Sequence, residues 1–65
     1  MQILIPTDIY DQDNNLLRIE FYDLDALFIF QIDWNEVFQQ SPEGQQLFRE
    51  DSYLIAQRKG YEIIV

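Results

Sequence analysis

The segment LRIEFY, residues 17–22, decides the fold class of this chain. Leu17, Ile19 and Phe21 alternate with more polar residues, and alternation with a period of two is typical of a β-strand with one buried face. The run DQDNN at residues 11–15 precedes it, and Asp and Asn favour tight turns. A half-buried strand that follows a tight turn indicates a hairpin, so we expect the fold to be built on a β-sheet.

Two further strands are expected, one before and one after this segment. Residues 2–10 begin with β-branched apolar residues, but Pro6 lacks the N–H that a sheet uses, which predicts an edge strand or a bulge. After a turn at residues 23–25, residues 26–32 are apolar at every position except Gln31. Such a run fits a strand that is covered on both faces, or one whose second face meets a partner.

The pattern changes from strand to helix at Asp33. Asp33 and Glu36 have the spacing of an N-terminal capping box, which predicts a short helix from residue 34 to about residue 39. Trp34 and Phe38 are four residues apart and are expected to pack from one face of this helix onto the sheet.

A second helix is expected from Pro42 towards residue 59, because Ser41 and Pro42 form a helix start signal and Gly60 a stop signal. Its apolar stripe is interrupted by the polar residues Asp51 and Ser52, so we expect the helix to break near Asp51, which could itself cap a third short helix. The residues expected to form the stripe are Leu47, Phe48, Leu54 and Ile55.

Residues 61–65 indicate a last strand, which gives the element order β-β-β-α-α-β. Strands that precede segregated helices favour the α+β class: a small antiparallel sheet with two or three short helices packed on one face. The last strand is expected at an edge, beside the first or the third strand. Residues 1–65 are expected to form a single domain, because the chain lies near the lower size limit of domains.

The charge balance is strongly acidic. The chain has 12 Asp and Glu residues against 4 Lys and Arg, and a formal net charge of −8. Direct binding to nucleic acids or to anionic membranes is not expected, because both depend on Lys and Arg. The charge either keeps a small domain soluble or presents carboxylates to a basic partner, in the extreme case as a mimic of a nucleic acid.

The residue types on which common catalytic and metal sites depend are scarce. The sequence contains no His and no Cys, so the usual general base, the thiolate nucleophile and the commonest transition-metal ligands are missing. The acids Glu20, Asp23 and Asp25 lie near one strand end, where an acidic solvated turn explains them without further chemistry. We therefore expect a protein that is not an enzyme, with no catalytic residues and no cofactor.

A partial calcium-loop motif is present at the first turn. Asp11, Asp13 and Asn15 match its opening, but Leu16 stands where glycine is needed and Tyr22 where the bidentate Glu is needed. A solvated turn is therefore expected, and no metal site is predicted there. Calcium binding remains the weakest of the alternatives.

The length of the chain limits the size of its core. A domain of about 60 residues buries only about 60% of its unfolded surface, so dense aromatic packing or a partner is needed. Trp34, Phe38 and Phe48 are expected in the core. A homodimer or a complex with another protein could use the apolar segment 26–30, which is much shorter than the roughly 20 residues of a membrane span. With no signal-peptide pattern, the expected location is the cytoplasm.

The sequence thus favours a small, acidic, non-enzymatic protein-interaction or regulatory domain that binds a protein partner or a second copy of itself. A nucleic-acid mimic that inhibits a basic nucleic-acid-binding protein is the alternative. Exposed aromatic residues are frequent at binding sites, and acids suit a basic partner. The candidate partner contacts are Tyr10, Tyr22, Asp23, Asp25 and Tyr53.

Overall fold

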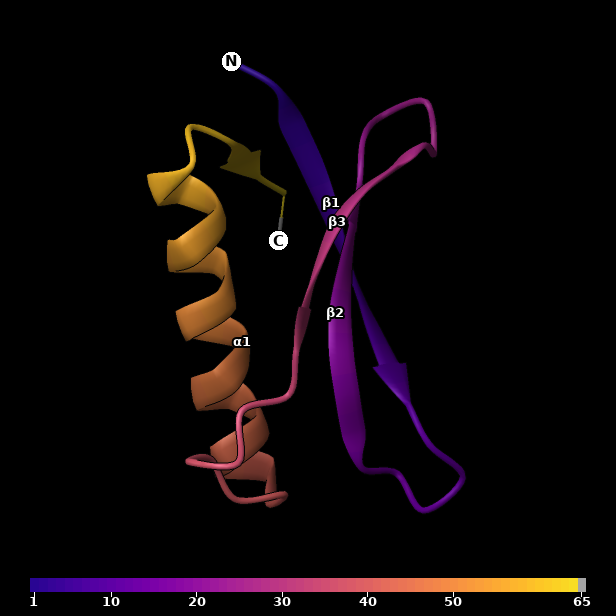
Figure 1. Cartoon of the computed structure of the whole chain (residues 1–65), viewed down its shortest axis with the longest axis vertical. Coiled ribbons are helices and arrows are strands. Elements are labelled where there is room, and N and C mark those ends of the chain that lie inside the picture. The colour runs from indigo at the N-terminus through magenta and orange to yellow at the C-terminus, as the bar shows by residue number, and fades with distance from the viewer. Residues whose placement is uncertain (65) are drawn as a thin grey trace.

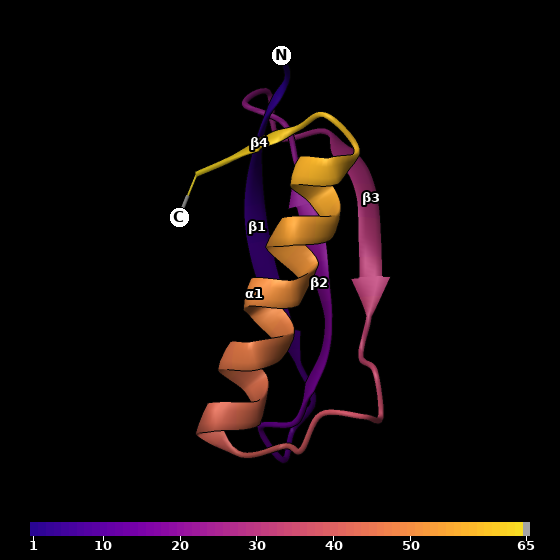
Figure 2. The same cartoon turned by 90° about the vertical axis from the view of Figure 1, so that its left-hand side faces the viewer.

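Four strands and one helix make up the part of the chain described by the computed structural model, residues 1–64 (Figure 1). They are β1 (Ile3–Tyr10), β2 (Leu16–Tyr22), β3 (Phe28–Asp33), α1 (Pro42–Arg58) and β4 (Glu62–Ile63). The strands form one sheet in the order β3-β2-β1-β4, and α1 lies along one of its faces (Figure 2). The α+β class is confirmed, with a single helix in place of the two or three expected.

The sheet is mixed, so the prediction of a purely antiparallel sheet was wrong. β1 pairs antiparallel with β2, and β2 pairs antiparallel with β3, as expected for consecutive hairpins. β4 returns from the far end of α1 and pairs parallel with the start of β1, at the edge of the sheet. It comprises Glu62–Ile63 and is shorter than the expected strand at residues 61–65; Val65 lies outside the described residues.

The third strand begins later than expected. Ala26 and Leu27 belong to the β2–β3 turn, and β3 starts at Phe28. The turn is longer because the side chain of Asp23 accepts hydrogen bonds from the N–H groups of Asp25 and Leu27 at 2.9 Å each. An Asp side chain that bonds the backbone ahead of it in this way favours a turn over a strand.

The short helix predicted from residue 34 to residue 39 does not form. Asp33 ends β3 instead of capping a helix, and the side chain of Asn35 accepts a hydrogen bond from the N–H of Val37 at 3.0 Å. Asn35 therefore caps a tight turn. The rings of Trp34 and Phe38 still meet edge to face, with centroids 6.2 Å apart, and both residues pack against the core. They do so from an irregular connection instead of a helix. Gln40 holds this connection by bonding the N–H and C=O of Leu16 at 2.9 and 2.8 Å.

The helix α1 is continuous, so the predicted break at Asp51 was wrong. The side chain of Ser41 accepts a hydrogen bond from the N–H of Gly44 at the start of the helix, as the start signal indicated. The expected apolar stripe was right in part: Phe48 is buried and Ile55 is half-buried, whereas Leu47 and Leu54 are exposed. The buried residues of α1 are spaced four apart, and three of the four are small: Gly44, Phe48, Ser52 and Ala56.

The core lies between α1 and the inner face of the sheet. Its fully buried apolar residues are Leu4, Leu16, Ile19, Phe21, Phe48 and Ala56. Phe21 stacks on Phe30 with ring centroids 4.7 Å apart, and Phe48 packs against Trp34 at 4.8 Å. These ring contacts are of the kind expected from dense aromatic packing.

Candidate interaction surface

The sheet has one face that no other element of residues 1–64 covers. Figure 2 shows α1 lying along one side of the sheet, and Figure 1 shows that no helix or strand lies on the opposite side. Side chains alternate between the two faces of a strand, so the residues beside buried Ile19 and Phe21 point away from α1. We call this bare side the open face.

Strand pairing arranges the open face in three rows across β1, β2 and β3. The first row is apolar or aromatic and contains Ile5, Tyr22 and Phe28. The second is Thr7, Glu20 and Gln31, and the third is Ile9, Arg18 and Asp33. The open face therefore has an apolar end, near the β2–β3 turn, and a polar end.

The apolar end exposes large side chains. Ile5 is 41% exposed and Phe28 is 51% exposed, and the rings of Tyr22 and Phe28 meet edge to face at 5.8 Å. We name these three residues, Ile5, Tyr22 and Phe28, the open-face patch. Two aromatic rings beside a branched aliphatic chain on a rigid strand scaffold form the kind of surface that anchors protein contacts.

Glu20, in the second row, accepts hydrogen bonds from the rows on either side of it. The hydroxyl of Tyr22 donates to Glu20 Oε1 at 2.6 Å, and Arg18 Nε donates to Glu20 Oε2 at 2.7 Å. These bonds, that from Tyr22 first and that from Arg18 second, hold the pKa of Glu20 below its ordinary value of 4.5. The bond to Glu20 raises the pKa of Tyr22 above 10.0. Because Glu20 fixes the hydroxyl of Tyr22, the ring is oriented within the patch.

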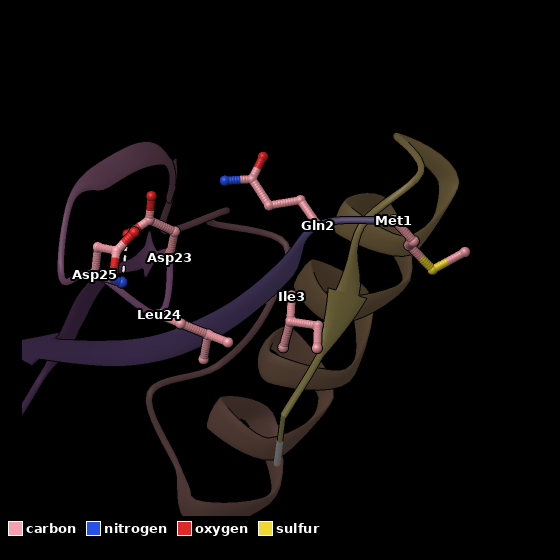
Figure 3. Close-up of a pocket in the computed structure, with 6 residues that line it drawn as sticks. All are labelled: Met1, Gln2, Ile3, Asp23, Leu24 and Asp25. Atoms are coloured by element: carbon pink, nitrogen blue, oxygen red, sulfur yellow. Dashed lines mark hydrogen bonds between the residues drawn. The ribbon is translucent and has the colours of Figure 1, made fainter.

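A shallow hollow of about 240 Å³ borders the apolar end of the sheet. It lies between the first residues of the chain and the β2–β3 turn, as Figure 3 shows, and Ile3 and Leu24 point the same way in it. Asp23 and Asp25 line it from the turn. Acids and apolar side chains thus lie next to each other at this end of the molecule.

The predicted contact residues fall on different sides of the molecule. Tyr22, Asp23 and Asp25 lie together at the apolar end of the sheet, where Asp23 is engaged in its own turn. Tyr10 and Tyr53 lie elsewhere. The hydroxyl of Tyr10 accepts a hydrogen bond from Arg49 of α1 at 2.7 Å.

Tyr53 lies on the helix side. It packs edge to face on the core residue Phe21 at 6.5 Å, and burial raises the pKa of its hydroxyl. Ile5 and Phe28 were missed by sequence reasoning, although the two-sided apolar character of residues 26–32 was a signal for Phe28.

In the partial calcium loop, the carboxylate of Asp11 is engaged by hydrogen bonds from within the turn. Asp11 accepts hydrogen bonds from the N–H of Asp13, the N–H of Asn15 and the side chain of Asn15, at 2.8 to 3.1 Å. The bonds from Asn15 are the main cause of a lowered pKa of Asp11. Within residues 1–64, no group of three or more acidic side chains is arranged to hold a metal ion.

Two more shallow hollows lie away from the open face. One, of about 320 Å³, is lined in part by Trp34 and Gln40, and the other, of about 310 Å³, by Val37 and Leu47. No helix in the described part of the chain is long and apolar enough to cross a membrane. Comparison with protein-family models, curated proteins and solved structures gives no match to this chain.

Proposed function

We propose that this protein is a small, acidic, non-enzymatic interaction or regulatory domain that binds a protein partner through the open face of its sheet. The observation that carries the proposal is the open-face patch. Ile5, Tyr22 and Phe28 form one row on a face without a covering layer, and Glu20 fixes the Tyr22 ring. Packed sheets normally bury such a row, so its exposure favours a contact with another molecule.

The acidic charge supports a basic partner but does not by itself favour a nucleic-acid mimic. The carboxylates are distributed over both turns, all four strands, the β3–α1 connection and α1. A mimic needs its acids in a regular row, like the phosphates of a nucleic acid. We therefore place the interaction function first, keep the mimic as the alternative, and retain the cytoplasm as the proposed location.

The proposal is tested by comparing partner recovery between matched variants. Phe28→Ser and Ile5→Thr remove apolar area from the patch, while Leu47→Ser removes a comparably exposed residue, 55% exposed, from α1, away from the open face. Affinity capture from cells that make the protein is quantified by mass spectrometry, and sedimentation reports self-association. We expect the same partner, or the same dimer, to be lost in the patch variants and retained in Leu47→Ser. Equal recovery in all three variants would contradict the proposal.

A further inference from the structure

β3 forms an edge of the sheet that lacks the usual protection against pairing. Strand edges expose unpaired N–H and C=O groups, which proteins commonly block with proline, lysine, a very short strand or a covering segment. β3 has six residues, contains no proline and no lysine, and carries one charge, Asp33, at its end. Its connection to α1 leaves from the end of the strand and does not run along its edge (Figure 2).

The opposite edge of the sheet has a proline, a very short strand and a covering segment. There, β4 covers the first part of β1 and is only two residues long. The part of β1 that continues beyond β4 contains Pro6. In the same part of the strand, Asp8 Oδ2 accepts a hydrogen bond from Arg49 Nε of α1 at 2.6 Å. One edge is therefore blocked and the other is open.

The hydrogen-bonding groups that β3 offers can be assigned from its pairing with β2. The N–H of Trp34 donates to the C=O of Leu17 at 2.9 Å, and these residues continue the register of the two strands. Because orientation alternates in an antiparallel pair, the backbone groups of Ile32 face β2, and those of Gln31 and Asp33 face outward. These outward groups point away from β2, and within residues 1–64 no other segment bonds them.

The side chains along β3 define what could pair with it. On the helix side, Phe30 and Ile32 pack on the core but remain half-exposed, and Lys59 lies 5.8 Å above the Phe30 ring. Asp33 lies on the open face at one end of the strand, and Asp25 lies in the turn that precedes the other end. The middle is therefore apolar on the helix side, and both ends are acidic.

We infer that the free edge of β3 binds an extended segment of a partner protein as an additional strand, with apolar side chains towards α1 and Lys or Arg at both ends. The inference rests on the proposed interaction function and names the chemistry of the partner. Charge decides between this occupant and a second copy: another chain with a net charge of −8 brings its own acids to the edge, whereas cations at the ends complement Asp25 and Asp33. Main-chain hydrogen bonds would supply affinity, and the end charges would supply specificity.

The test uses the peptide acetyl-Lys-Val-Thr-Val-Thr-Val-Lys-amide, which reads the same in both directions and therefore suits parallel or antiparallel pairing. A twin with Glu at both ends measures the charge preference. Two further peptides, N-methylated on the valines or on the threonines, measure the need for backbone hydrogen bonds, since one set of amides faces β3. Binding to the whole chain is followed by the ¹⁵N shifts of Gln31 and Asp33.

We expect the Lys peptide to shift these two amides and to bind at least ~10-fold more tightly than the Glu twin, with a smaller difference at high salt. One N-methylated peptide should lose binding and the other should retain it. On the protein, Gln31→Pro removes an outward N–H, and an edge strand tolerates proline at such a position. We expect Gln31→Pro to lose peptide binding and Gln31→Ala to retain it. If Gln31→Pro does not fold, as judged by circular dichroism, the two N-methylated peptides decide.

Three results would overturn the inference. Equal binding of the Lys and Glu peptides would refute the charge rule, and absence of shifts at Gln31 and Asp33 would refute the edge as the site. A dimer of the free protein that Gln31→Pro dissociates would assign the edge to a second copy. Loss of the inference in any of these ways leaves the proposed function standing if Phe28→Ser still loses the captured partner, so the two failures are distinguishable.

Discussion

Asn14 and Ala26 occupy the same position in two turns of the same geometry, and both have positive φ, 64° and 63°. In each turn an Asp side chain, Asp11 or Asp23, accepts two backbone N–H bonds, from the residues two and four positions ahead. The residue three positions after the Asp then takes the left-handed conformation. Asn tolerates that conformation well, whereas for Ala it is strained.

Replacing the strained residue should stabilise the protein. We expect Ala26→Gly to raise the free energy of unfolding by about 0.5–1 kcal/mol, because the relief of left-handed strain exceeds the added flexibility of the unfolded chain. The reverse change, Asn14→Ala, should lower it by about 1 kcal/mol. Urea unfolding followed by circular dichroism measures both, and a less stable Ala26→Gly variant would show that the turn is not strained.

Gly44 is required by a close approach. A Cβ atom added at Gly44 would lie 1.8 Å from the carbonyl oxygen of Gln39, where backbone cannot easily move away. In an open helix, Gly→Ala would stabilise by about 1 kcal/mol; here we expect Gly44→Ala to destabilise by about 1–3 kcal/mol. Thermal unfolding gives the sign of the change directly.

Gly60 provides the comparison for Gly44. Gly60 has a φ of 96°, but a Cβ atom added there would have no atom within 4 Å. Gly60→Ala should therefore lower the free energy of unfolding only by the conformational cost of about 1–2 kcal/mol. Gly60→Asn should cost less, since Asn tolerates positive φ. A side chain of any kind at Gly44 would still meet Gln39, so Asn there should cost more stability than Asn at Gly60. An equal loss of stability in Gly44→Asn and Gly60→Asn would argue against the contact with Gln39.

The buried hydroxyl of Ser52 has no hydrogen-bond partner within residues 1–64, and the residue is fully buried. An unpaired buried polar group is unfavourable, and Ala is also the better helix former. We expect Ser52→Ala to raise the free energy of unfolding by about 1 kcal/mol. Ser52→Val, which adds volume where α1 approaches the sheet, should lower it. A destabilised Ser52→Ala would reveal a bond that the hydroxyl makes in solution.

Local patterns predicted the first two strands well, because the apolar alternation at residues 17–22 and the β-branched residues at the start of the chain act within the strand itself. The start of α1 was predicted for the same reason: Ser41 caps Gly44 directly. The helix expected at residues 34–39 rested on the spacing of Asp33 and Glu36 alone. The side chain of Asn35 bonds the N–H of Val37 and forms a turn there instead.

The buried stripe of α1 and the open face could not be read from periodicity. Ser52 looked like an interruption, but a small residue is what allows the helix to approach the sheet there. Which face of the sheet stays bare depends on where the single helix packs, and this is a property of the whole fold. The parallel pairing of β4 with β1 is non-local in the same way.

The last prediction concerns the pair Glu20 and Tyr22 on the open face. The Tyr22 hydrogen bond is the main cause of the lowered pKa of Glu20, so Tyr22→Phe should raise that pKa towards 4.5. Arg18→Gln should also raise it, since the Arg18 bond is the second cause. Because the folded pKa of Glu20 lies below its unfolded value, the pair stabilises the protein above about pH 4.5, and this contribution is lost as the pH falls through the folded pKa. Titration of the Glu20 carboxyl carbon by NMR measures the shift. In the converse experiment, Glu20→Gln should lower the raised pKa of Tyr22. An unchanged Glu20 pKa in Tyr22→Phe would mean that the bond does not persist in solution, and that the ring of the open-face patch is not held by it.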